Sequence, residues 1–142
     1  MRSTICVTGG AGFIGSHIAD ALVSDGHRVL IVDDLSSGRK ENVPKDAELH
    51  VLDVRSEEAG ELLVDRKVEI LVHHAAQMDV RRSVADPLFD AEVNLLGLLN
   101  LLEAARGGSL KQVIFASTGG AIYGEQDEFP ADEHHVARPL SP

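Results

Sequence analysis

The sequence predicts an α/β fold in which a doubly wound parallel sheet of five strands is covered by helices. Short and mostly apolar runs at residues 5–7, 28–32, 48–52, 69–72 and 113–116 are typical of strands buried on both faces. Segments with the apolar spacing of helices separate these runs. Right-handed crossovers then favour a Rossmann-type sheet with the strand order 3-2-1-4-5.

The first two helices are marked by their ends. Residues 13–25 carry apolar side chains at helical spacing, and Gly26 stands where a helix stop is expected. Ser56, which is followed by two glutamates, begins a short helix that ends near Arg66. Each helix therefore lies between two predicted strands, as a parallel sheet requires.

The longest predicted helix covers residues 86–106. It begins at Asp86, a good N-cap, with Pro87 in the first turn. Its apolar residues surround it instead of forming one stripe, so one face should cover the sheet and another should meet a neighbouring helix or a second subunit. These residues are Leu88, Phe89, Val93, Leu95, Leu96, Leu98, Leu99, Leu101 and Leu102. After Ser117 we expect a polar loop as far as Pro142.

Composition limits the class of protein. A length of 142 residues suits one domain, or one half of a two-lobed enzyme. The formal net charge of −10 argues against binding to nucleic acid or to an anionic membrane. A single cysteine, Cys6, excludes an internal disulfide and fits a core position in a reducing, cytoplasmic environment. We find no targeting signal, and no apolar stretch approaches the roughly 20 residues that span a bilayer.

A glycine-rich segment, T-G-G-A-G-F-I-G at residues 8–15, follows the first strand and opens the first helix. Gly9 permits a tight turn, Gly12 lets the backbone approach a pyrophosphate, and Gly15 allows close packing of helix and strand. The helix N-terminus adds N–H donors and a positive dipole. We therefore expect a dinucleotide-binding loop; the alternative is a tight turn without a ligand.

An acidic residue ends the second strand, about 20 residues after the glycines, where this fold places its ribose-binding acid. The Asp33 carboxylate would accept hydrogen bonds from the ribose hydroxyls and repel a 2′-phosphate, and Asp34 adds a second negative charge. These acids favour NAD over NADP. Arg39 and Lys40 leave NADP open, because a basic side chain near the 2′ position tolerates a phosphate.

Taken together, the motifs resemble the sugar-nucleotide branch of the extended short-chain dehydrogenase/reductase family. V-D-D-L-S-S-G at 32–38 is similar to the second-strand motif of UDP-glucose 4-epimerases. Asp53-Val54 resembles the pair that meets the adenine, and H-A-A-Q at 74–77 the H-x-A-A segment along the cofactor. N-L-L-G at 94–97 resembles the N-x-x-G of the long helix, and A-S-T-G-G-A-I-Y-G at 116–124 the Ser/Thr loop after strand five. The resemblance covers the whole chain in order.

The resemblance implies an NAD site made by residues from all of these motifs. The residues expected to contact the cofactor are Gly9, Gly12, Phe13, Ile14, Gly15, Asp33, Asp34, Leu35, Ser36, Ser37, Gly38, Asp53, Val54, His74, Ala75, Ala76, Gln77, Asn94 and Ser117.

The resemblance also implies a reaction: UDP-glucose and UDP-galactose are interconverted through oxidation at C4 of the hexose by bound NAD. Thr118, beside Ser117, matches the catalytic hydroxyl that binds the sugar 4-OH. The family's base is the Tyr of a Tyr-x-x-x-Lys motif, but the one tyrosine here is Tyr123, and Asp127 stands four residues later. In the family that motif follows a segment resembling residues 138–142.

We therefore expect residues 1–142 to be the NAD-binding domain of a UDP-hexose epimerase, truncated before the Tyr-x-x-x-Lys helix and without the substrate domain. Such a chain should bind NAD without turnover. The family also implies a homodimer through the 86–106 helix, and an apolar surface that makes the chain self-associate.

Two other classes stay open. An NAD-sensing module that lacks catalysis would share this fold. A fragment of a sugar-nucleotide dehydratase or decarboxylase is disfavoured, because those enzymes carry an acid where Gly119 and Gly120 stand.

The remaining polar pairs favour structural roles. His73-His74 and His134-His135 lack a third ligand at suitable spacing, so we expect no metal site. Arg81-Arg82 fits the solvated start of a helix better than a phosphate contact.

Overall fold

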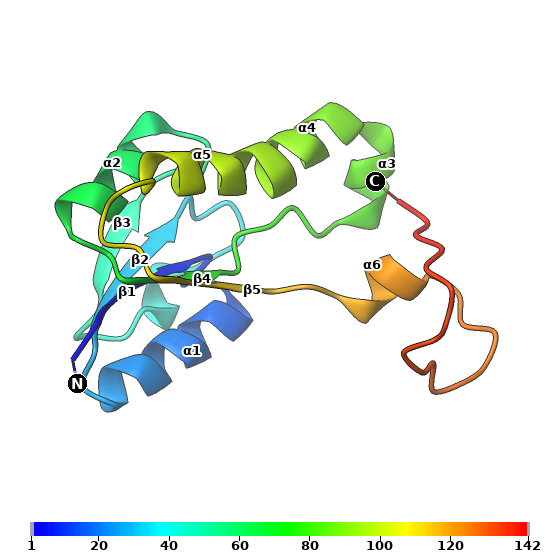
Figure 1. The fold of residues 1–142 in the computed structure, drawn as a ribbon, viewed down its shortest axis with the longest axis horizontal. Helices are drawn as coiled ribbons and strands as arrows, with labels where there is room; N and C mark the ends of the chain where they lie inside the picture. The colour runs from blue at the N-terminus through cyan, green and yellow to red at the C-terminus, as the bar shows by residue number, and fades with distance from the viewer. Residues whose placement is uncertain (1, 142) are drawn as a thin grey trace.

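A computed structural model describes residues 2–141, with only the backbone of Ala121, and contains one five-stranded parallel sheet in the order β3-β2-β1-β4-β5 (Figure 1). The strands are β1 (Thr4–Thr8), β2 (Arg28–Asp33), β3 (Glu48–Val51), β4 (Ile70–His73) and β5 (Gln112–Phe115). The predicted fold class and strand order are confirmed. Each strand begins and ends within one residue of the predicted bounds.

The helices agree with the prediction in two places and differ in two others. Those present are α1 (Phe13–Ser24), η1 (Lys40–Asn42), α2 (Glu57–Asp65), α3 (Val80–Ala85), α4 (Pro87–Ala91), η2 (Glu92–Leu96), α5 (Gly97–Ala104) and α6 (Gly119–Tyr123). Ser56 and Asp86 cap α2 and α4 with their side chains, as expected. The polar loop expected after Ser117 is wrong at its start, where α6 forms. The segment after β2, for which no helix was predicted, contains the short 3₁₀ turn η1.

The helix predicted at 86–106 is continuous but not regular. Its middle turn, η2, is a π-helix, in which hydrogen bonds span five residues instead of four; such single turns inside α-helices are frequent at functional sites. Gly97 follows this turn and lies so close to Val54 that an added Cβ would be 2.7 Å from a Val54 methyl group. Apolar spacing predicts a helix here but does not reveal the π turn.

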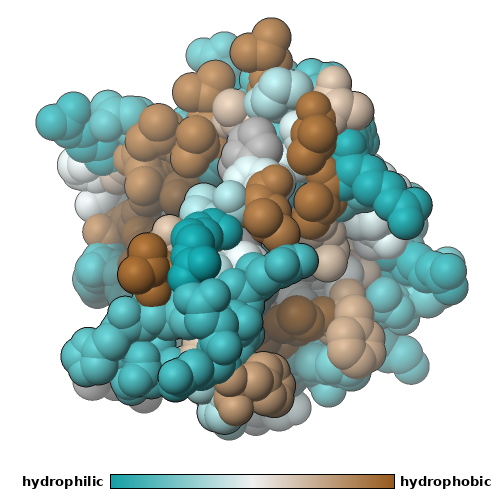
Figure 2. All heavy atoms as spheres, turned by 90° about the vertical axis from the view of Figure 1, so that its right-hand side faces the viewer, coloured by the Kyte–Doolittle hydropathy of each residue, from teal (hydrophilic) through white to brown (hydrophobic). Residues whose placement is uncertain are grey.

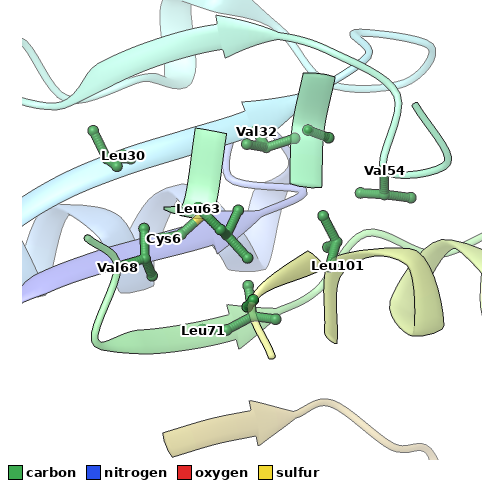
Figure 3. Close-up of a cluster of buried hydrophobic side chains, with 10 residues drawn as sticks. Cys6, Leu30, Val32, Val54, Leu63, Val68, Leu71 and Leu101 are labelled. Atoms are coloured by element: carbon green, nitrogen blue, oxygen red, sulfur yellow. The ribbon is translucent and has the colours of Figure 1, made fainter. Parts of the chain in front are cut away.

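Two apolar layers hold the sheet. One lies under α2 and α5, where Cys6, Leu63, Leu71 and Leu101 are fully or almost fully buried (Figure 3). The other lies against α1 and contains Ile5, Val7, Ala19, Val29, Ile31 and Val72. Strand β5 is different, because Val113, Ile114 and Phe115 are 40%, 46% and 56% exposed. Within residues 2–141, no helix combines the length and apolar character needed to cross a membrane.

The carboxyl ends of all five strands meet at one edge of the sheet, at the right in Figure 1. Asp33 is the last residue of β2, and the other strand ends are followed by the glycine loop, Asp53, the 74–77 segment and Ser117. Figure 2 looks onto this edge and shows several hydrophobic groups separated by hydrophilic loops. In doubly wound sheets, ligands bind in the crevice at this edge.

Candidate functional site

The first turn of α1 leaves backbone donors free. The N-cap residue of this helix is Gly12, which has no side chain to cap it, and the first turn contains no acidic residue. Within residues 2–141, neither the N–H of Phe13 nor that of Ile14 has an acceptor. These two N–H groups and the positive end of the helix dipole form a site for a negatively charged group such as a phosphate.

The glycines of the loop are required by close backbone contacts. Gly9 has a φ of +67°, and a Cβ there would lie 2.8 Å from the backbone nitrogen of Ala75. A Cβ on Gly15 would overlap the carbonyl oxygen of Gly9. The loop is thus pressed against both its own helix and the segment after β4.

Asp33 is buried and bound to two loops. Its Oδ2 accepts the N–H of Ala11 and its Oδ1 accepts the N–H of Leu35, each at 2.9 Å. Leu35 adopts a φ of +60°, a strained conformation that a leucine rarely adopts, in the turn that follows this hydrogen bond. Each oxygen keeps one lone pair, so the carboxylate can still accept the hydroxyls of a ribose.

The other predicted residues of this loop lie beside Asp33. Asp34 accepts the N–H and the hydroxyl of Ser36 through its Oδ1, at 2.9 Å and 2.6 Å, and Ser37 is exposed. A Cβ on Gly38 would come within 2.7 Å of Asp33 Oδ1, so the loop can fold over the carboxylate there.

The segment after β4 is fixed to β1 by a hydroxyl that our sequence analysis did not single out. The Thr8 Oγ1 accepts the backbone N–H groups of His74 and Ala75, both at 3.2 Å. The same oxygen contacts His73, a buried histidine that was also missed as a site residue. The H-x-A-A pattern also matches residues 73–76, H-H-A-A, with His73 as its histidine. This match was the signal in the sequence that could have identified His73 as a site residue.

Asn94 in the π turn holds the far end of that segment. Its Oδ1 accepts the N–H of Gln77 at 2.8 Å, and its Nδ2 donates to the Gln77 carbonyl at 3.0 Å. The Gln77 side chain in turn donates to Asp90, a buried acid, at 3.1 Å. Asn94 and Gln77 are thus brought together as predicted site residues, whereas Asp90 was missed because nothing in its spacing distinguishes it. Ala76, the residue before Gln77, is exposed.

The predicted adenine-binding pair divides into one surface and one core residue. Val54 is buried in the layer under α5, and Asp53 forms a bidentate pair with Arg55. Hydrogen bonds from Arg55 hold the pKa of the Asp53 carboxyl below its usual value. Asp53, Arg55 and Glu92 line a cavity of about 560 Å³, which is the right order of size for a small-molecule site.

Ser117 and Thr118 lie at the end of β5, and both are exposed. Thr118 is the N-cap residue of α6, and its hydroxyl has no hydrogen-bond partner among residues 2–141. Tyr123, at the end of α6, packs edge-on against His135. The Thr118 hydroxyl is therefore free to bind a ligand, whereas Tyr123 takes part in packing the following loop.

The remaining polar pairs are accounted for locally. Arg81 and Arg82 lie in the first turn of α3, capped by Asp79, and Arg82 stacks 3.7 Å from the centre of the Phe89 ring. This agrees with the predicted helix start. In the part of the chain that the structure describes, no three His, Cys, Asp or Glu side chains gather as metal ligands would.

Comparison with known proteins identifies the family. A model of the NAD dependent epimerase/dehydratase family matches residues 5–142. The UDP-glucose 4-epimerase of Mycolicibacterium smegmatis is 44% identical over 96% of this chain and 45% of its own length.

Two solved structures are similar throughout this chain. The UDP-glucose 4-epimerase of Thermus thermophilus in complex with NAD is 47% identical, with a TM-score of 0.89. The UDP-glucose 4-epimerase of Thermotoga maritima with UDP-glucose is 44% identical, also with a TM-score of 0.89. Each match covers 97% of this chain and 45% of the other, so the chain spans somewhat less than half the length of these relatives. From the glycine loop to the end of β5, the chain belongs to the NAD-dependent epimerase/dehydratase family.

Proposed function

We propose that this chain is the NAD-binding portion of an epimerase that interconverts UDP-glucose and UDP-galactose. The observation that carries the proposal is the pair of unpaired N–H groups of Phe13 and Ile14 at the start of α1, beside the buried Asp33 carboxylate. The first offers donors to a pyrophosphate, and the second offers acceptors to a ribose. The relatives that are UDP-glucose 4-epimerases support the choice of reaction.

The other site residues take roles that fit their surroundings. Thr8 and Asn94 hold the two ends of the 74–77 segment, so that this segment forms a fixed wall along the cofactor. The free hydroxyl of Thr118 binds the 4-OH of a UDP-hexose. NAD, when bound, supplies the reversible oxidation at C4 of the hexose.

Calorimetric titration with NAD, with NADP as the comparison, tests the cofactor. We expect saturable binding that is selective for NAD, because the Asp33 and Asp34 carboxylates repel a 2′-phosphate. Equal affinity for both cofactors would contradict the role of Asp33. No heat from either, in a chain whose circular dichroism is that of a folded α/β protein, would contradict the proposal itself.

A substitution at Phe13 tests the donors directly. Phe13 is the first residue of α1, where proline fits a helix, and Gly12 before it is extended, with a φ of −77° and a ψ of 175°. Phe13→Pro therefore removes one free N–H while keeping the helix, and Phe13→Ala removes the ring while keeping the N–H. We expect Phe13→Pro to bind NAD about tenfold more weakly than Phe13→Ala, because a hydrogen bond to a charged group is lost. Equal affinities would contradict the phosphate site.

The rate at which bound NAD is released separates an epimerase portion from an NAD-sensing module. Position 127 is Asp, so Tyr123 is not followed by the lysine of a Tyr-x-x-x-Lys motif. We expect these 142 residues to bind NAD without converting UDP-galactose. Rapid reversible exchange of NAD at cellular concentrations would favour a sensor, whereas retention of NAD through gel filtration would favour the epimerase portion.

A further inference from the structure

We propose that Asn42 is a positioning residue that fixes the glycine loop by holding the carbonyl of Ala11. This inference rests on the proposed function, because it assigns to Asn42 a part in presenting the loop to the pyrophosphate. Asn42 lies in η1, nine residues after Asp33 in a segment that the sequence motifs do not reach.

Ala11 is the buried centre of the glycine loop, and both polar groups of its backbone are bound, to the end of β2 or to the segment after it. Its N–H donates to Asp33 Oδ2 at 2.9 Å. Its carbonyl oxygen accepts the Arg39 N–H at 3.0 Å and the Asn42 Nδ2 at 2.9 Å, which fills both lone pairs. The two peptide groups that flank the Ala11 Cα are thereby bound, and the Gly9 N–H adds a further hydrogen bond, to the Val32 carbonyl at 2.8 Å.

This fastening determines where the free donors point. Ala11 precedes Gly12, whose N–H donates to the Gly9 carbonyl at 3.1 Å and closes the tight turn. The free N–H groups of Phe13 and Ile14 follow directly. Gly9, Gly10 and Gly12 have no side chains with which to hold the loop, so its orientation depends on backbone contacts, among which those of Ala11 are the most numerous. Asn42 supplies the one side-chain donor among the groups that bind the Ala11 carbonyl.

The role of Asn42 differs from that of Asp33. Asp33 faces both the loop and the expected ribose, so its replacement changes two things at once. Asn42 reaches the carbonyl from η1 through a partly buried hydrogen bond, and its effect on a ligand is exerted through Ala11 alone. Asn42 is therefore a positioning residue that acts through the Ala11 carbonyl.

Two variants separate the loss of the Asn42 hydrogen-bond donor from a change in the size of the side chain. Asn42→Ala removes the amide, and Asn42→Asp keeps its size but places an acceptor opposite the Ala11 carbonyl. We expect NAD affinity to fall about threefold to tenfold in Asn42→Ala and at least as far in Asn42→Asp, as the loss of one net hydrogen bond implies. Asn42→Asp with wild-type affinity would overturn the proposal.

A second readout does not depend on NAD. Amide hydrogen exchange followed by NMR should show the Ala11 N–H exchanging faster in both variants, because its loop is held less firmly. Gly26→Ala serves as the matched control: this glycine has a φ of +83° at the opposite end of α1, so the change strains the fold away from the loop. The Gly26→Ala variant should keep the wild-type NAD affinity. The exchange rate of the Ala11 N–H, relative to the rates of the β1 amides, should also stay the same.

The two readouts keep the proposals apart. Wild-type protein that fails to bind NAD overturns the proposed function, and the exchange of Ala11 then decides the positioning role alone. Unchanged exchange at Ala11 in both Asn42 variants overturns the positioning role, whatever the affinity for NAD.

Discussion

The hydroxyl oxygen of Thr8 lies 2.8 Å from Nδ1 of His73, and both side chains are buried. Because this oxygen already accepts two backbone N–H groups, its own proton is directed to Nδ1, and the neutral ring carries its hydrogen on Nε2. The ring also stacks on Phe115, 6.2 Å between centroids. A neutral histidine thus joins β1, β4 and β5 at the edge of the sheet where the site lies.

This histidine makes stability depend on pH. Burial, and secondly the nearby His74, lowers the pKa of His73 from 6.5 to about 4. Between these two values the unfolded chain binds a proton that the folded chain does not. Stability is therefore full above the unfolded pKa and falls as the pH falls toward 4, by at most about 3 kcal/mol.

Urea unfolding of wild-type and His73→Gln proteins, at about pH 7.5 and about pH 5, checks this expectation. His73→Gln should be less stable at the higher pH, yet should lose less stability on acidification. His17→Gln, at an exposed position in α1, is the control and should keep the wild-type pH dependence. A pH dependence that is the same in wild type and His73→Gln would contradict the assignment.

A second prediction concerns Gly15 in α1. Alanine normally favours a helix over glycine by about 1 kcal/mol, so propensity alone predicts that Gly15→Ala stabilises the protein. The new Cβ would overlap the Gly9 carbonyl, however, and we expect a net loss of about 2 kcal/mol or more together with loss of NAD binding. Thermal unfolding and calorimetry measure both. Gly120→Ala in α6, whose Cβ meets no atom closer than 3.7 Å, should not destabilise the protein.

The fold was predictable because each of its determinants is local. The strand order follows from buried apolar runs that alternate with helices. The glycine loop is recognised by the spacing of its glycines, and Asp33 by its distance of about 20 residues from them. The contacts that fasten the site are not local. Asn42 reaches Ala11 across 31 residues, and His73 reaches Thr8 across 65. A single sequence does not reveal such partners.

The π turn shows a further limit of the sequence. Leu95 and Leu96 are apolar, and spacing alone places them in a regular helix with buried faces. In the structure they are 63% and 56% exposed, and the turn is shaped around Asn94, which binds the backbone of Gln77. A tertiary hydrogen bond overrides the regular period here, and hydrophobic periodicity carries no information about it.

A third prediction uses two helices that end in the same way. Gly26 after α1 and Lys67 after α2 both have positive φ, +83° and +52°. In each case the next residue donates back across the last turn, His27 to Leu22 and Val68 to Leu63, both within 3.1 Å. This is the Schellman motif, which favours glycine at the position that Lys67 occupies.

Lys67→Gly should therefore stabilise the protein by about 0.5–1 kcal/mol, and Gly26→Lys should destabilise it by a similar amount. Thermal unfolding of the two variants and of their combination measures both effects, and the two should nearly cancel in the double variant. A destabilised Lys67→Gly protein would show that the lysine side chain has a role of its own.

The last prediction concerns association. Leu88, Leu95 and Leu99 are 77%, 63% and 53% exposed along the segment from α4 to α5. Leu95 and Leu99 are four residues apart and so lie on one face of the helix. From this apolar face, together with exposed β5, we expect the 142-residue chain to self-associate as its concentration rises. The double change Leu95→Glu and Leu99→Glu should shift it toward the monomer in light scattering, because burying two carboxylates in a contact is costly.

Val64→Glu, at an exposed apolar position of α2, is the matched control and should leave association unchanged. A monodisperse wild-type monomer at every concentration would contradict the prediction and, with it, the proposed dimer through the 86–106 helix.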